Sequence, residues 1–130
     1  MKKLLTLFCS LAISAIAMAQ DADIKILGIN DMHSGVQNFP KLAYVVDSIR
    51  ALHPDVLLMA AGDNRTGNPV NDMHEVPNLP MVELMNAVGF NASSMGNHEC
   101  DLNARNFAYS INESQFPYIV ANVYTADTLK

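Results

Sequence analysis

Two short segments of the chain place carboxylates and a histidine at spacings that suit metal ligation. Asp31 and His33 stand two positions apart, and side chains two apart on an extended segment point to the same side, so one cation can contact both. Asp63 follows Gly62, whose backbone freedom permits the turn that projects a side chain from a strand tip. A carboxylate has two oxygens and can bridge two cations, so Asp63 suits a dinuclear centre.

A third segment adds an amide, a second histidine and another carboxylate. Asn97 offers a neutral carbonyl oxygen to a hard or borderline cation. His98 is expected to point elsewhere than Asn97 and to act on substrate. Asp101 is placed either to cap the next helix or to orient His98. Taken singly, an asparagine or aspartate here equally suits a helix cap, and a lone histidine equally suits the surface.

The hydrophobic pattern predicts the elements that must position these residues. Strands are expected at residues 24–29, 56–61, 90–95 and 118–123. Helices are expected at residues 40–52, 80–88 and 102–113. The first strand reads as buried, and the continuous apolar run 56–61 is expected to be covered on both faces. Alternating strands and helices predict an α/β fold with a mostly parallel sheet, whose strand ends would bring the three polar segments to one edge.

A long loop is expected over residues 63–79, where glycine and proline interrupt any regular pattern. Within it, residues 71–74 repeat the NDMH of residues 30–33 letter for letter. No strand precedes this second copy, so nothing fixes its side chains toward a common ion. A solvated loop is therefore preferred over a second ligand pair.

The first nineteen residues have the pattern of a secretory signal peptide. Two lysines precede an apolar run that ends on Ala17-Met18-Ala19, a small-residue cleavage site. The alternative is a membrane anchor, which needs about 20 apolar residues. We expect cleavage, a mature segment 20–130 without a membrane span, and a periplasmic or extracellular location. Cys100 is then left as a lone cysteine, which excludes an intramolecular disulfide.

Composition excludes several classes of protein. Hydrophobic residues make up 50% of the 130 positions and charged residues 16%, which excludes a disordered tail and a coiled coil. A formal net charge of -5 argues against a nucleic-acid polymer as partner. The length suits a single modest domain.

In combination, the polar segments are far more specific than each alone. Residues 30–35 (NDMHSG), 61–67 (AGDNRTG) and 95–101 (MGNHECD) resemble the first three sequence blocks of calcineurin-like metallophosphoesterases. Among these they are most similar to the secreted 5′-nucleotidase and UDP-sugar hydrolase family, and so are residues 116–118 and 121–123. The resemblance covers nearly all of residues 24–123. It implies that the chain forms the first half of a layered α/β/β/α domain.

The resemblance also implies roles for individual residues. Asp31 and His33 would bind the first of two divalent cations, such as zinc, manganese or cobalt. Asp63 would bridge the pair, and Asn97 would bind the second. His98, paired with Asp101, would stabilise the phosphoryl transition state. The implied reaction is hydrolysis of 5′-nucleotides or related phosphate esters, including cyclic nucleotides and UDP-sugars, to nucleoside and phosphate.

The implied ligand set is short. The second cation receives only Asp63 and Asn97, whereas a catalytic ion usually has about three protein ligands. The family supplies the others from later histidines, and no histidine follows His98. We therefore expect the amino-terminal part of a longer enzyme, without its C-terminal half and with little or no activity alone. The alternatives are a non-catalytic module that binds a metal or nucleotide, and an inactive truncation product.

Overall fold

The computed structural model describes residues 23–124. The expected signal peptide, residues 1–19, lies outside the described residues, as do residues 20–22 and 125–130. Within the described range the strands are β1 (Ile26–Ile29), β2 (Leu57–Ala60) and β3 (Ala92–Ser93). The helices are α2 (Phe39–Leu52), α3 (Pro69–Asp72), α4 (Leu79–Val88) and α5 (Ala104–Glu113). Two 3₁₀ turns, η1 (Val36–Asn38) and η2 (His98–Cys100), complete the elements.

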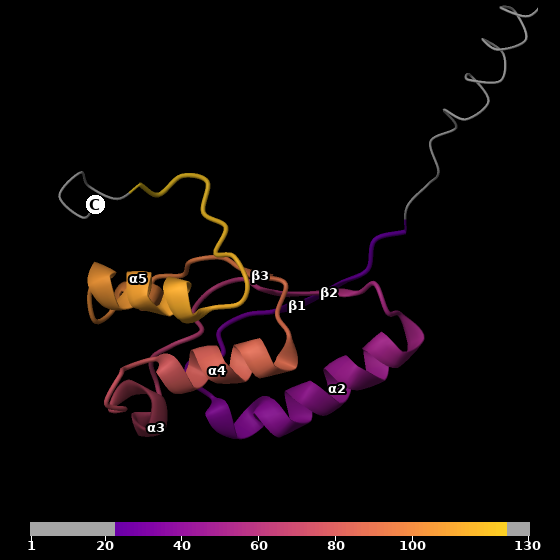
Figure 1. The fold of residues 1–130 in the computed structure, drawn as a ribbon, viewed down its shortest axis with the longest axis horizontal. Coiled ribbons are helices and arrows are strands. Elements are labelled where there is room, and N and C mark those ends of the chain that lie inside the picture. The colour runs from indigo at the N-terminus through magenta and orange to yellow at the C-terminus, as the bar shows by residue number, and fades with distance from the viewer. Residues whose placement is uncertain (1–22, 125–130) are drawn as a thin grey trace, which may run out of the picture.

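The strands form a parallel sheet in the order β1-β2-β3 (Figure 1). Ile26 is in register with Leu57, and Met59 with Ala92. Helix α2 connects β1 to β2, and α4 lies between β2 and β3 in the chain. The predicted α/β class and the parallel sheet are therefore confirmed, and the carboxyl ends of all three strands meet at one edge.

Proline and glycine set the bounds of the helices close to the predicted ones. Pro40 lies in the first turn of α2 and Pro80 in that of α4, where proline's missing N–H costs no intrahelical bond. Helix α4 ends at Gly89, whose φ of 79° is left-handed and whose N–H reaches back to the Met85 carbonyl. At α5, the Asn103 side chain accepts the N–H of Asn106 and so fixes the first turn.

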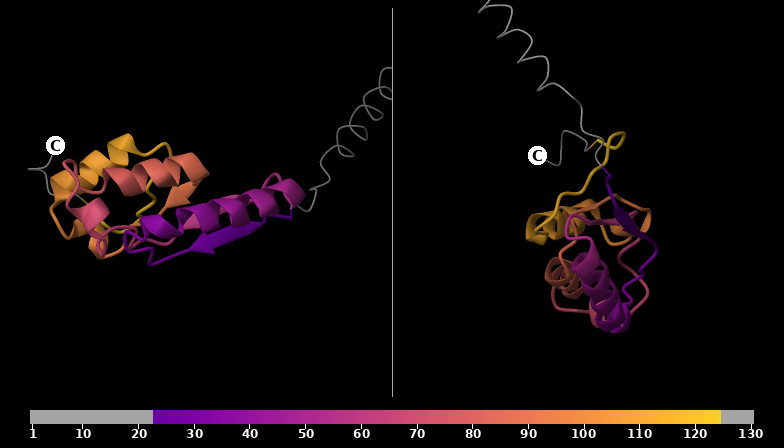
Figure 2. Two further views of the ribbon diagram at one scale, coloured as in Figure 1. Left: turned by 90° about the horizontal axis from the view of Figure 1, so that it is seen from below. Right: turned by 90° about the vertical axis from the view of Figure 1, so that its right-hand side faces the viewer.

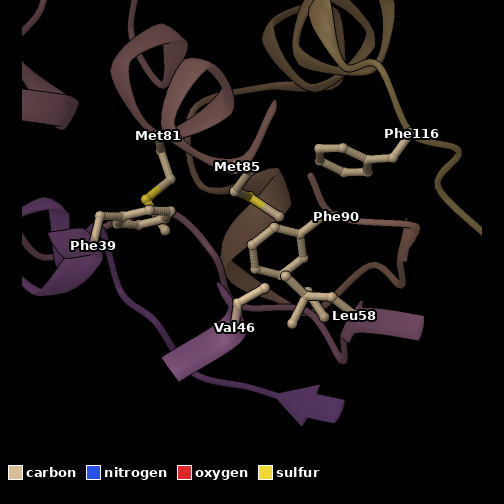
Figure 3. Close-up of a cluster of buried hydrophobic side chains, with 8 residues drawn as sticks. Phe39, Val46, Leu58, Met81, Met85, Phe90 and Phe116 are labelled. Atoms are coloured by element: carbon tan, nitrogen blue, oxygen red, sulfur yellow. The ribbon is translucent and has the colours of Figure 1, made fainter. Parts of the chain in front are cut away.

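The hydrophobic core lies between the sheet and helices α2 and α4 (Figure 3). Val46 from α2 and Met81 and Met85 from α4 are at most 1% exposed and pack with Leu58 of β2. The full cluster contains Phe39, Val46, Leu58, Ala60, Met81, Met85, Phe90 and Phe116. This packing holds the strands, and with them the loops at their carboxyl ends, in a fixed arrangement.

The prediction that β2 is covered on both faces is wrong, and β1 is likewise less buried than expected. Leu58 is 1% exposed, but its neighbour Leu57 is 37% exposed, and Ile26 of β1 is 61% exposed. The reason is that α2 and α4 cover the same face of the sheet, with α2 running along the strands (Figures 1 and 2). The other face carries a hollow of about 510 Å³, lined in part by Met59 and Ile119.

The predicted fourth strand at 118–123 is also wrong. Tyr118 makes a single parallel bridge to Ser93, and Ile119 donates its N–H to the Ser93 carbonyl at 2.8 Å. Strand β3 is only Ala92–Ser93 rather than the expected 90–95. Because β3 ends there, residues 119–124 form no strand, and Val123 is 53% exposed. None of the helices within residues 23–124 combines the length and apolarity that crossing a bilayer requires.

Candidate metal centre

The loops after β1 and β2 continue side by side beyond the ends of the strands. The N–H of Asp31 reaches the Gly62 carbonyl at 3.3 Å, and the N–H of His33 reaches the Asp63 carbonyl at 3.0 Å. Backbone hydrogen bonds therefore continue between the two segments past the ends of the strands. It brings the first two predicted polar segments together, as the strand order requires.

The segment that carries Asp31 and His33 is a turn, so the prediction of an extended conformation is wrong. Both residues are left-handed, with φ of 52° and 46°. The turn nevertheless brings the side chains together, with His33 Nε2 3.6 Å from Asp31 Oδ1. A left-handed non-glycine residue costs roughly 1–2 kcal/mol, and such conformations cluster at functional sites. The hydrogen bonds to the neighbouring loop hold the turn in place.

Glycines allow the loops after β2 and β3 to touch. Gly62 has a φ of 98°, and a Cβ atom there would lie 2.5 Å from the Gly96 nitrogen. The prediction that Gly62 makes an unusual turn is confirmed. Asp63 follows with a φ of 53°, and its Oδ1 accepts the N–H of His98 at 2.9 Å. The side chain of Asp63 is therefore fixed by the third polar segment.

Side chains from the three strand ends converge. His33, Asp63 and His98 each offer one ligand atom, and these atoms all lie within 4.8 Å of one another. Within the described part of the chain, no other group of three histidine, cysteine or acidic residues has this geometry. The two imidazole rings meet edge to face, with centroids 4.7 Å apart. Two imidazoles and a carboxylate, all partly exposed, make a donor set that fits zinc, manganese or cobalt.

His98 and Asp101 form a direct pair. Nδ1 of His98 lies 2.6 Å from Oδ2 of Asp101. This hydrogen bond is the main reason that the pKa of His98 is raised above its ordinary value; the nearby charges of Asp101, Asp63 and Glu99 add to it. The pKa of Asp101 is lowered, chiefly by the same bond. Of the two predicted placements of Asp101, the structure shows the one that orients His98.

Asn97 precedes His98 in the chain, but no hydrogen bond fixes its side chain within residues 23–124. The residue is exposed to solvent. His98 is expected to point elsewhere than Asn97, and its ring lies beside that of His33. The roles of Asn97 as a metal ligand and of His98 as a substrate contact stay predictions.

The duplicate tetrapeptide does not form a second ligand pair. His74 is exposed and shares a hydrogen bond with Val76. The rest of the tetrapeptide is not a solvated loop, because α3 forms there and Asn71 is 0% exposed. Asn71 accepts the N–H of Met81 and donates to the Ser34 hydroxyl. It therefore links the 63–79 segment to α4 and to the loop after β1.

Sequence reasoning assigned no role to Glu99 or Arg65, both of which are nearly fully buried. Glu99 accepts hydrogen bonds from backbone N–H groups of two loops. The guanidinium of Arg65 donates to the side chain of Asn106 on α5. The available signal is that each charged residue lies inside a segment that carries predicted ligands, residues 61–67 and 95–101. Burial of either residue is a property of the assembled loops and is invisible in the residue pattern.

Residues 24–129 match the calcineurin-like phosphoesterase family. The chain is 33% identical over 138 residues to protein UshA of Escherichia coli, covering 96% of this chain and 25% of UshA. It is 26% identical to a 2′,3′-cyclic-nucleotide 2′-phosphodiesterase/3′-nucleotidase of Haemophilus influenzae, covering 95% and 22% respectively. The chain thus spans about a quarter of the length of these curated relatives.

Solved structures agree in fold. A putative 5′-nucleotidase from Staphylococcus aureus superimposes with a TM-score of 0.70 at 18% identity, over 82% of this chain and 24% of the other. The NAD nucleotidase NadN of Haemophilus influenzae gives 0.68 at 23% identity, over 81% and 21%. At these identities the likeness shows the fold alone, and it confirms the predicted architecture.

Proposed function

Because the chain belongs to the calcineurin-like phosphoesterase family, we propose that it is part of a divalent-metal-dependent phosphoesterase of the 5′-nucleotidase type. The observation that carries this proposal is the convergence of His33, Asp63 and His98 from three separate strand ends. The substrate class would be 5′-nucleotides or related phosphate esters, hydrolysed to nucleoside and phosphate. The names of the relatives, which include a cyclic-nucleotide phosphodiesterase, support a nucleotide substrate.

The proposed cofactor is a pair of divalent cations. His33 and Asp63 would hold them, with Asp31 and Asn97 completing the part of the set that this chain supplies. Asp31 lies beside His33, which supports its inclusion. When bound, such cations polarise the phosphoryl group and make water a stronger nucleophile at neutral pH. We propose that further ligands come from outside residues 23–124.

The chain's own acid–base pair would act on the phosphate. Asp101 Oδ2 would accept a hydrogen bond from the Nδ1–H of His98, which leaves Nε2 as the free nitrogen of the ring. A raised pKa favours the imidazolium form of His98, in which Nε2 also carries a proton. That N–H would donate to a phosphoryl oxygen and stabilise the charge that develops on it. Asp101 thereby orients the ring and supports its positive charge.

We further propose that the enzyme is exported to the periplasm or cell exterior and acts in nucleotide catabolism. The signal-peptide pattern of residues 1–19 supports export. A second candidate function is binding of a metal or nucleotide without turnover. It is favoured by the small size of the ligand group within residues 23–124, which holds three side chains.

One experiment separates the two candidates. Phosphate release from AMP is measured for the natural gene product with added manganese, cobalt or zinc, and with a chelator as control. Cobalt binding by the same gene product is measured in parallel, with Asp63→Ala as the matched variant. Metal-dependent release supports the phosphoesterase. Cobalt binding that Asp63→Ala abolishes, without phosphate release, supports the binding module. A chain that binds no cobalt contradicts both.

A further inference from the structure

Glu99 is a buried acidic residue at the base of the candidate metal centre. It is 1% exposed, although its neighbours His98 and Cys100 are accessible. Within residues 23–124 it forms no ion pair with a basic side chain. A buried acidic side chain is costly unless hydrogen bonds or a charge satisfy it. The partners of Glu99 therefore indicate what it does.

Those partners are three backbone N–H groups on two different loops. Oε2 accepts from Asp63 at 2.9 Å and from Gly96 at 2.6 Å, and Oε1 accepts from Asn64 at 2.8 Å. Hydrogen bonds from N–H groups to an acidic side chain are among the stronger ones in proteins. A single side chain thus fastens the loop after β2 to the loop after β3.

The turn at Gly62 and Asp63 is shaped for this contact. Both residues have positive φ, at 98° and 53°, and the N–H groups of Asp63 and Asn64 donate to the two oxygens of one carboxyl group. Successive N–H groups in such a turn form a concave binding site for an anion. Here the anion is internal, since Glu99 occupies that site. Glu99 therefore satisfies the two N–H groups that this left-handed turn presents.

Asp63 is also linked to His98, the residue before Glu99. Oδ1 of Asp63 accepts the N–H of His98 at 2.9 Å, directly beside Glu99. Backbone and side chain of Asp63 are thus both held by consecutive residues of η2. Movement of Glu99 would change the direction of the Asp63 carboxylate and its distance from the ring of His98.

We propose that Glu99 is a positioning residue for the metal centre, setting the orientation of Asp63 by holding the two loops together. The inference rests on the proposed function, because it assigns Asp63 to a cation. Glu99 is outside the candidate ligand group of His33, Asp63 and His98 and would not itself hold the cation. Loss of its acceptor oxygens would weaken cation binding through the backbone of Asp63 and Gly96.

The test is a cobalt titration of the natural gene product, followed by its absorption spectrum. Glu99→Gln keeps the shape but replaces one acceptor oxygen with an NH₂ group, which faces an N–H donor. We expect about 10- to 100-fold weaker cobalt binding, the range typical when a residue behind a metal ligand is changed. The matched control is Ser110→Ala on α5, which also removes buried hydrogen bonds. It should lower stability but leave cobalt affinity unchanged.

A second measurement keeps the proposal testable if Glu99→Gln fails to fold. Binding and loop order must be coupled in both directions. Cobalt should therefore slow hydrogen exchange at the amides of Asp63, Asn64 and Gly96 in the unaltered chain. Unchanged cobalt affinity in folded Glu99→Gln, or unchanged exchange at these amides, overturns the role of Glu99 alone. Failure of the unaltered chain to bind cobalt overturns the proposed function as well.

Discussion

Gly96 and Asp63, 33 positions apart in the chain, lie so close that a Cβ atom on Gly96 would fall 2.1 Å from Asp63 Oδ1. The same atom would lie 2.6 Å from the Asp63 nitrogen. The side chain of Asp63 has room only because Gly96 has no side chain. The glycine of the third polar segment is therefore as necessary to the candidate site as the polar residues beside it.

We predict that Gly96→Ala destabilises the chain by about 1–3 kcal/mol, the usual cost of overpacking. Relief of the clash must move backbone atoms, so cobalt binding should weaken in the same variant. Urea unfolding and cobalt titration measure the two effects. Gly28→Ala is the matched control, since a Cβ atom on Gly28 meets nothing within 4 Å. Equal stability of the two variants would contradict the close contact.

A second prediction concerns His98. In the natural gene product, His98→Ala should lower kcat for AMP hydrolysis by about 10²-fold or more, since a hydrogen-bond donor to the transition state is lost. Bound metal, measured by elemental analysis, should remain. Asp63→Ala should instead abolish turnover together with metal binding. Equal metal loss in both variants would show that His98 is a ligand, as its place beside His33 and Asp63 allows.

The pairing of His98 with Asp101 gives a third prediction. Asp101→Asn keeps a polar group of the same size but removes the negative charge that supports the imidazolium. We expect kcat to fall by about 10- to 100-fold with KM and metal content little changed. The measurement is steady-state kinetics on AMP at neutral pH. An unchanged kcat in this variant would mean that the charge of Asp101 does not contribute to catalysis.

The sequence predicts the helices and the convergence of the strand ends, but not which face of the sheet is covered. The helix of Met81 and Met85 is predicted because proline, apolar spacing and Gly89 are local signals. The meeting of His33, Asp63 and His98 follows from the parallel strand order, which periodicity also predicts. The bare face at Ile26 is not predictable in this way, because an apolar run looks the same whether one or two layers cover it.

The other errors have the same origin. Residues 118–123 have strand propensity, yet a strand needs a partner, and β3 ends at Ser93. Asn71 reads as a loop residue because its burial depends on contacts with Ser34 and Met81, which are distant in the chain. Glu99 is overlooked for the same reason. Residue type and spacing predict local conformation, whereas tertiary contacts decide which polar residues are buried.

The core offers a fourth prediction that does not depend on function. Met85 is 0% exposed and packs in the main cluster, so Met85→Ala should cost about 2–5 kcal/mol of unfolding free energy through lost burial and a cavity. Met73 is 83% exposed, and Met73→Ala should change stability by no more than about 0.5 kcal/mol. Urea unfolding of both variants measures the difference. Similar values would contradict the placement of α4 against the sheet.

The last prediction concerns pH and Asp72, which lies at the end of α3. Burial by itself raises the pKa of this carboxyl, but four hydrogen bonds outweigh burial and lower the pKa below its ordinary value of 3.8. Two come from the backbone N–H groups of Gly67 and Asn68, and two from the side chains of Ser34 and Asn71. All four favour the ionised form, because it only accepts hydrogen bonds.

The direction of the pH effect follows from that shift. Since the folded state lowers the pKa of Asp72, its contribution is fully present above the unfolded value and is lost as pH falls through the folded one. Asp72→Asn replaces an acceptor with an NH₂ group opposite the Gly67 N–H. The variant should therefore be about 1–3 kcal/mol less stable at pH 7. Below the folded pKa the difference from wild type should shrink, since Asp72 is then protonated.

Glu75→Gln, an exposed acid in the same segment, is the control and should match wild type throughout. Urea unfolding from pH 7 down to pH 3 measures the three curves, and a constant gap between Asp72→Asn and wild type would contradict an ionised, hydrogen-bonded Asp72.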